Sequence, residues 1–183
     1  YSIYIVLTAL LVILLLTAGM PLYDALVHAF GTAGTGGFSI KNLSIGAYGS
    51  VFIDIIITVF MFLFGINFTL YYHMLKGNIK SFYKDEEFRF YIGLILASII
   101  AITLDLVLNG LYSVGEGLRY SAFQVNSIIS TTGYATADFN LWPVFSKFVL
   151  VMLMFIGPCA GSTGGSMKCI RYLLLFKIIK REL

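Results

Sequence analysis

Charged residues are scarce in this sequence. Only 11% of its 183 residues are Asp, Glu, Lys or Arg, whereas 59% are hydrophobic. A soluble globular domain has roughly 25% charged residues. The composition therefore excludes an ordinary soluble domain and predicts an integral membrane protein. The formal net charge of +3 is too small to indicate nucleic acid as a partner.

Cysteine and histidine are rare as well. Cys159 and Cys169 lie on the side that the charge distribution below assigns to the cytoplasm, where a structural disulfide is not expected. His28 and His73 are too few for a zinc site and are expected to pack or to form hydrogen bonds. We also expect no bound organic cofactor and no enzymatic activity in this chain.

An initial Met and a secretory signal are also missing. No basic segment followed by an apolar segment and a cleavage site is present. The first residues already resemble the middle of a membrane helix. We therefore expect this sequence to be a piece of a longer protein.

Long apolar runs are present and are separated by polar or Gly-rich breaks. Tyr1 to about Gly19, Val51–Tyr72 and Phe90–Leu108 each approach the roughly 20 residues that a membrane-spanning helix needs. A last helix begins after Trp142-Pro143 and runs to Ile156. It is expected to resume at Met167 after a Gly-rich interruption.

Two further apolar segments, Leu22–Ala33 and Leu118–Ile129, are too short to cross a bilayer. Each precedes a flexible stretch of Thr and Gly. Irregular backbone at membrane depth is tolerated only where protein or water surrounds it. The sequence therefore predicts two re-entrant segments, each a short helix followed by a returning loop.

The two flexible stretches are copies of one pattern. Thr35-Gly-Gly-Phe-Ser39 aligns with Thr131-Thr-Gly-Tyr-Ala135, and the equivalent glycines are 133 − 37 = 96 residues apart. We predict an all-α integral membrane fold with two tandem helix–pore helix–filter–helix units, which is half of a pseudo-fourfold potassium-channel-like pore. The expected boundaries are 1–76 for the first unit, 77–89 for a cytoplasmic linker and 90–183 for the second unit.

Both stretches suit a filter for a dehydrated cation. Thr-Thr-Gly-Tyr resembles the Thr-Val-Gly-Tyr-Gly filter of potassium channels, in which backbone carbonyls replace the water around the ion. Glycine adopts the dihedral angles that this arrangement needs without steric cost. The alternative is a pair of Gly/Thr-rich turns between membrane helices. The predicted potassium-binding residues are Thr35, Gly36, Gly37, Phe38, Thr131, Thr132, Gly133 and Tyr134.

A second Gly-rich segment interrupts the last helix. It is not a nucleotide-binding loop, because Ser166-Met-Lys168 stands where such a loop needs Gly-Lys followed by Ser or Thr. Close packing of small residues is one interpretation, and an unwound segment that obstructs the pore is the other. The residues of this predicted gate loop are Gly157, Pro158, Cys159, Ala160, Gly161, Ser162, Thr163, Gly164, Gly165, Ser166 and Lys168.

Basic residues predict the orientation. The loop 76–89 holds four Lys and Arg residues and the stretch from 168 onward holds five, whereas 20–50 and 109–142 hold one each. Cytoplasmic segments carry the excess of positive charge. We predict a multi-pass protein of the cell membrane, with 76–89 and the C-terminal tail in the cytoplasm and both filter stretches open to the outside.

Several motifs, in order along nearly the whole chain, resemble the Trk/Ktr potassium-transporter superfamily and its TrkH-like membrane subunits. They are Met20-Pro-Leu-Tyr-Asp24, Gly36-Gly-Phe-Ser39, Lys84-Asp-Glu-Glu-Phe-Arg89, Ser130-Thr-Thr-Gly-Tyr134 and Gly161-Ser-Thr-Gly-Gly-Ser-Met-Lys168 with Ile170-Arg171.

This resemblance implies potassium uptake through one pore surrounded by four pore-loop units, of which this chain matches the second and third. It also implies a homodimer of membrane subunits and cytosolic nucleotide-binding regulatory subunits of the TrkA/KtrA type. Pro158 departs from the family pattern, because the gating loop of the family is usually glycine-rich at this place.

Potassium uptake through a channel-like pore with a carbonyl filter and an intramembrane gate is thus the favoured function. A proton- or sodium-coupled potassium symporter is the alternative within transport. A non-conducting membrane scaffold subunit is the alternative from another class.

Overall fold

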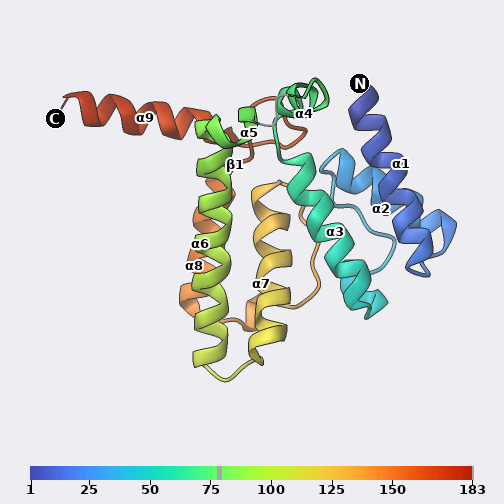
Figure 1. Ribbon diagram of the computed structural model, residues 1–183. Helices are drawn as coiled ribbons and strands as arrows, with labels where there is room; N and C mark the ends of the chain where they lie inside the picture. Colours follow the sequence, from blue (N-terminus) through green and yellow to red (C-terminus); the bar gives the residue numbers. More distant parts are fainter. Residues whose placement is uncertain (78–79, 183) are drawn as a thin grey trace.

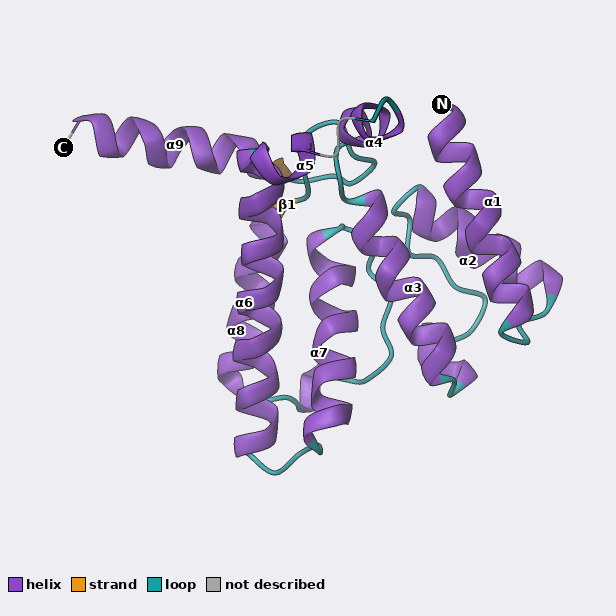
Figure 2. Ribbon diagram, in the orientation of Figure 1, coloured by secondary structure: helices purple, strands orange, loops and turns teal. Residues whose placement is uncertain are grey.

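The computed structural model describes residues 1–77 and 80–182, and helices make up most of them (Figures 1 and 2). Two short strands, β1 (Ile156–Gly157) and β2 (Met167–Lys168), pair in parallel. The helices in chain order are α1 (Ser2–Thr17), α2 (Leu22–Ala33), the 3-10 helix η1 (Ser44–Tyr48), α3 (Val51–Phe64), α4 (Phe68–Leu75), α5 (Lys80–Lys84), α6 (Glu86–Leu108), α7 (Val114–Ile129), the 3-10 helix η2 (Phe139–Leu141), α8 (Val144–Phe155) and α9 (Cys169–Glu182).

The helices form two groups that lie side by side (Figure 1). The first group packs α1 and α2 against α3, and the second packs α7 and α8 against α6, while α3 and α7 join the two groups. The core of the first group also contains Phe123 and Tyr134, which come from the second group. The two halves therefore share a hydrophobic core and are not independent domains.

The outer surface is apolar. Leu96, Ile100 and Leu104 recur every four residues along one side of α6, and each is more than half exposed. Such a continuous apolar face is unusual for a soluble monomer. Within the described residues, α6 is the one helix that is long and apolar enough to cross a membrane alone, and α3 with α4 also qualifies if the bent pair counts as one span.

Helices α6 and α7 begin about one turn earlier than the apolar runs predict, because polar side chains cap their first turns. The Asp85 side chain accepts a hydrogen bond from the Phe88 amide at 2.7 Å, so α6 includes the end of the predicted charged linker. Ser113 and Glu116 form a reciprocal capping box at the start of α7. In both places the first turn is polar, and hydropathy alone therefore misses it.

The predicted spanning helix Val51–Tyr72 is wrong. The chain bends by 90° between α3 and α4. Asn67 starts α4 by accepting a hydrogen bond from the Thr69 amide at 2.9 Å. The bend frees the Gly65 carbonyl, which accepts a hydrogen bond from the Cys159 amide at 3.0 Å.

The second unit is interrupted at the equivalent place in the repeat. Gly65 of the first unit corresponds to Gly161 of the second, because 161 − 65 = 96. Here the chain leaves α8, forms the predicted gate loop and continues as α9, which projects sideways from the helical body (Figure 1). The last helix of each unit is therefore broken in the same region of the repeat, although α8 already ends at Phe155 and Gly161 lies within the loop.

The break after α3 supports a prediction about Gly65. A methyl group at this position would overlap the Tyr91 hydroxyl, whereas one at Gly93 on the adjoining helix would meet nothing within 4 Å. Gly65→Ala is expected to destabilise the fold by about 1–3 kcal/mol through overpacking. Gly93→Ala is the matched control. Unfolding midpoints of the purified full-length variants test this, and equal midpoints would contradict it.

Candidate functional site

The structure brings the two Thr/Gly stretches into contact. Each begins where a short helix ends, at Ala33 for α2 and at Ile129 for α7. The α-carbon of Gly37 lies directly against the carbonyl oxygen of Thr132, so that any side chain there would overlap it. Residues almost 100 positions apart in sequence thus form one site.

Both stretches have the same unusual backbone conformation. The φ angles of Thr35 and Gly37 are 51° and 65°, and those of the equivalent Thr131 and Gly133 are 62° and 86°. The residues between them, Gly36 and Thr132, do not have positive φ. A left-handed conformation is uncommon for a non-glycine residue and costs roughly 1–2 kcal/mol. The surrounding structure therefore holds both threonines in place.

The peptide groups of the second stretch are oriented by α7. The amides of Thr132 and Gly133 donate to the Ser127 carbonyl at 3.0 and 3.1 Å. Because the N–H and C=O of a trans peptide point in opposite directions, the carbonyls of Thr131 and Thr132 point away from α7. The first stretch repeats this contact, since the Gly36 amide donates to the Gly31 carbonyl at 2.8 Å.

The aromatic residue that ends each stretch has a different environment in the two copies. Tyr134 is completely buried, and its hydroxyl donates to the carbonyls of His28 and Phe38 at 3.3 and 3.4 Å. The equivalent Phe38 is 82% exposed. The second unit therefore inserts its aromatic side chain into the first unit, and the first unit has no such partner within the described chain.

His28 supports the first stretch from behind. Its ring nitrogens lie 2.7 Å from the Asp24 carbonyl and 2.9 Å from the Ser39 hydroxyl, which agrees with the expected hydrogen-bonding role. The Tyr48 hydroxyl donates to the Asp24 carboxylate at 2.6 Å. Burial and this hydrogen bond raise the pKa of Tyr48, so the phenol stays protonated. The sequence predicts a hydrogen-bonding role for His28 but does not identify Ser39 and Asp24 as its partners, because these contacts depend on how the stretch after α2 folds back.

The predicted gate loop packs directly against the start of the second stretch. Gly164 fits between the Pro158 ring and the Ser130 carbonyl, with no room for a side chain. The Gly165 amide donates to the Thr131 hydroxyl at 2.7 Å. On the other copy, the Thr35 hydroxyl lies 3.4 Å from the Thr163 carbonyl. The two equivalent threonines thus both contact the loop.

The loop also fills the break between α3 and α4. Besides the bond from Cys159 to Gly65, the Phe68 amide donates to the Gly161 carbonyl at 3.2 Å. The Lys168 ammonium bonds the Gly164 carbonyl and lies 3.4 Å from the Ser162 hydroxyl. The loop is therefore hydrogen-bonded to the α3–α4 break of the first unit and, through Lys168, to its own C-terminal end.

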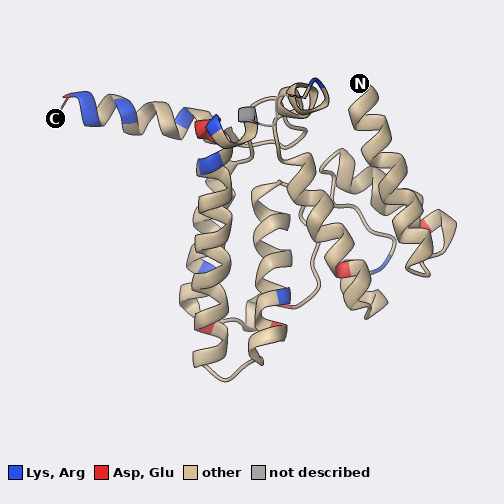
Figure 3. Ribbon diagram, in the orientation of Figure 1, with Lys and Arg blue, Asp and Glu red and all other residues tan. Residues whose placement is uncertain are grey.

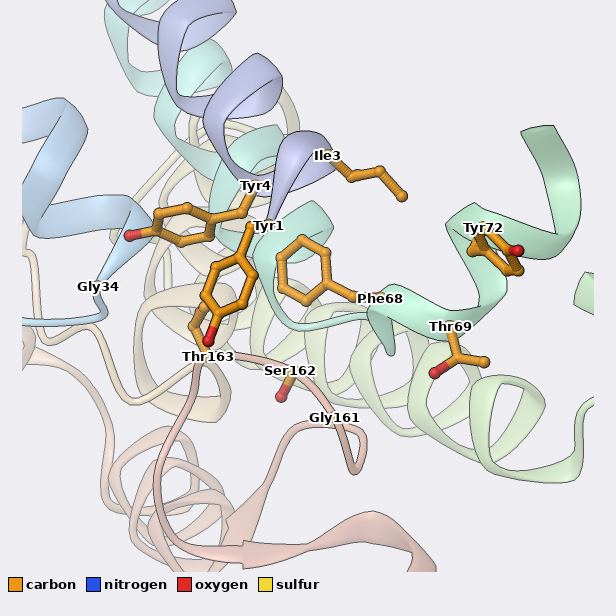
Figure 4. Close-up of a pocket in the computed structure, with 10 residues that line it drawn as sticks. All are labelled: Tyr1, Ile3, Tyr4, Gly34, Phe68, Thr69, Tyr72, Gly161, Ser162 and Thr163. Atoms are coloured by element: carbon orange, nitrogen blue, oxygen red, sulfur yellow. The ribbon is translucent and has the colours of Figure 1, made fainter.

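A cavity of about 720 Å³ adjoins the first stretch and the loop (Figure 4). Gly34, which precedes the first stretch, lines it together with Ser162 and Thr163 of the loop. The aromatic side chains of Tyr4 and Phe68 form its apolar wall. No cluster of His, Cys, Asp or Glu that could hold a metal occurs among the described residues. The two stretches contribute backbone carbonyls and the hydroxyls of Thr35, Thr131 and Thr132 to this region.

Apolar outer faces around an irregular but hydrogen-bonded centre define a helical membrane protein. The family model for TrkH, a cation transport protein, matches residues 1–183. The potassium uptake protein TrkH of Salmonella typhimurium is 42% identical over all of this chain and 38% of its own length. TrkG of Escherichia coli is 35% identical over 91% of this chain and 34% of its own length.

A crystal structure of the potassium transporter TrkH from Vibrio parahaemolyticus matches 99% of this chain and 40% of its own chain, with 37% identity and a TM-score of 0.93. The chain therefore belongs to the TrkH family of cation transport proteins, as its motifs predict. Its mostly helical architecture matches that of the transporter structure, and its relatives are named as transport proteins and not as enzymes. It spans about 38% of the length of the curated relatives.

The buried Tyr134 hydroxyl leads to a second prediction. Tyr134→Phe removes the donor to the carbonyls of His28 and Phe38, and should lower stability by about 0.5–1.5 kcal/mol. Tyr23→Phe, at a position that is 66% exposed, is the control and should have little effect. The unfolding midpoint of the full-length protein is the measurement. A Tyr134→Phe midpoint equal to that of the control would show that this hydroxyl does not join the units.

Proposed function

We propose that this chain forms two neighbouring quarters of a potassium-uptake pore. Residues 35–38 and 131–134 are two of its filter strands, and potassium is the transported substrate. The filter strands are carried by units 1–76 and 90–183, which the linker 77–89 joins. The related proteins are named for potassium uptake, which supports this substrate.

The observation that carries the proposal is the repeated backbone conformation. Positive φ angles alternate with other values at equivalent residues of both stretches. This alternation turns successive peptide groups to the same side, unlike the alternating directions of an extended strand. Carbonyls collected in this way replace the hydration shell of a potassium ion. The C-terminal ends of α2 and α7 add partial negative charge beside them.

Two pairs of equivalent positions, each covered in one unit and open in the other, support a ring of four units. The α-carbon of Gly37 is covered by the following strand, whereas the equivalent Gly133 has nothing within 4 Å. The ring of Tyr134 is buried in the preceding unit, whereas Phe38 is exposed. Two further pore-loop units of the same polypeptide would cover these positions, one on each side.

The loop from Gly157 to Ser166 with Lys168 is proposed as the gate. It lies against Ser130 and Thr131, at the entrance to the second filter strand. The cavity beside Gly34 would then be part of the space that a moving loop leaves open to the ion (Figure 4). Pro158 packs on Gly164 and stiffens the closed loop.

The distribution of charge supports a multi-pass membrane protein with a cytoplasmic tail. Lys and Arg gather around α9, the start of α6 and the α4–α5 region, at one end of the molecule (Figure 3). Cytoplasmic ends of membrane proteins carry this excess. We propose the lipid bilayer, a second membrane subunit and cytosolic nucleotide-binding subunits as the partners.

Alanine substitutions at the two filter glycines test the pore. In the full-length protein, Gly37→Ala and Gly133→Ala should both abolish rubidium uptake by potassium-starved cells, because each creates strain at positive φ. Gly37→Ala also clashes with the Thr132 carbonyl, and Gly133→Ala would clash with the strand of the proposed following unit. Gly115→Ala, which has free space around it, is the control.

Which variants lose rubidium uptake distinguishes the possible functions of the two stretches. Uptake retained by Gly37→Ala would exclude these stretches as the filter. Uptake lost in Gly37→Ala but kept in Gly133→Ala would mean that no strand follows the second unit. If even the unsubstituted protein fails to take up rubidium, the scaffold function is favoured, whereas uptake that depends on external protons or sodium favours a symporter.

Neighbouring glycines of the loop test the gate. A methyl group on Gly164 would overlap Pro158 and lie 2.8 Å from the Ser130 carbonyl, whereas one on Gly165 would make ordinary contacts of 3.5 Å or more. Gly164→Ala should therefore push the loop from the filter and raise basal rubidium flux several-fold. Gly165→Ala should leave it near the unsubstituted level. Equal flux in both variants would assign the loop to packing alone.

A further inference from the structure

Glu87 occupies a position that neither the fold nor the filter explains. It is the second residue of α6 and follows a charged segment, yet its side chain is only 6% exposed. None of the ion pairs formed by the described residues involves it. A buried carboxylate needs hydrogen-bond donors to offset its lost hydration.

Its donors come from the two ends of the gate loop. The Glu87 Oε1 atom accepts a hydrogen bond from the Ala160 amide at 2.7 Å and another from the Ile170 amide at 3.0 Å. Ala160 lies near the start of the loop, and Ile170 lies just after its end. One oxygen atom therefore holds together two backbone segments that are ten residues apart.

The Ile170 amide also belongs to the first turn of α9. The first four amides of a helix lack partners within the helix, and an acidic side chain near them is favoured by the helix dipole. Glu87 thus caps α9 from a different helix. Since α9 projects from the body of the molecule, its base is the place where its movement reaches the loop (Figure 1).

We infer that Glu87 is a positioning residue that holds the loop closed and joins both loop ends to the base of α9. This inference rests on the proposed gate. A displacement of α9 by about 1 Å would take the Ile170 amide beyond hydrogen-bond distance. The same oxygen would then hold Ala160 alone, and the loop would lose one of its two attachments to α6.

The experiment measures hydrogen exchange at the amides of Ala160 and Ile170 in the full-length protein, together with rubidium flux. Glu87→Ala should accelerate exchange of both amides by about tenfold or more, because it removes charge-assisted hydrogen bonds. Glu87→Gln retains an acceptor oxygen and should give an intermediate rate. If Glu87→Ala fails to fold, the exchange rates measured in Glu87→Gln still test the inference.

Glu86→Gln is the matched control. It removes the same charge one residue earlier, from an exposed side chain that pairs with Lys177 of α9 and does not contact the loop. Any loosening of α9 in this control should accelerate exchange at Ile170 and leave Ala160 near the unsubstituted rate, so Ala160 is the decisive amide. Ala160 exchange that rises in the Glu87 variants alone supports the inference. Unchanged Ala160 exchange in those variants, or equal acceleration of Ala160 in Glu86→Gln, overturns it.

The flux measurement keeps this inference separate from the proposed gate. Faster exchange with raised basal flux supports both. Faster exchange with unchanged flux supports the attachment by Glu87 and overturns the gating role of the loop.

Discussion

The structure depends on two broken helices that satisfy each other's backbone hydrogen bonds. A helix interrupted at membrane depth leaves amide and carbonyl groups that water cannot reach, and each unpaired group costs several kcal/mol. Gly65 after α3 and the loop after α8 meet at this point, where the Cys159 amide and the Gly65 carbonyl pair. Neither break would be tolerated alone, so the two units require each other.

The two units also depend on each other at the centre of the molecule. Tyr134 belongs to the second unit in sequence but lies in the hydrophobic core of the first. Asp54 on α3 and Arg119 on α7 form an ion pair at 3.7 Å between the same two units. The second unit alone would expose Tyr134, and the first unit alone would leave the Asp54 carboxylate without its ionic partner. The repeat is therefore a unit of sequence, and the folding unit is larger.

Much of this arrangement follows from local sequence. The bounds of α2 were predicted because Pro21 begins the helix and a Gly-rich stretch ends it. The 96-residue repeat correctly identified the two stretches that come together. These features are local or periodic, and a single chain displays them directly.

The features that sequence analysis missed depend on distant partners. Hydropathy is high throughout Val51–Tyr72, and the break at Gly65 becomes favourable only because Cys159 supplies a donor. Likewise, Glu87 looks like one of several acidic residues in a charged segment. Its burial becomes evident only when the amides of Ala160 and Ile170 are placed beside it.

The two threonines at positive φ connect these observations. Glycine would adopt the left-handed conformation at Thr35 and Thr131 without the cost of about 1–2 kcal/mol. Threonine instead supplies a hydroxyl, and at both positions that hydroxyl contacts the loop. The hydrogen bond from the Gly165 amide to Thr131 offsets part of the strain. A movement of the loop therefore changes what holds the threonines in their strained conformation, and the loop and the carbonyl stretches cannot rearrange independently.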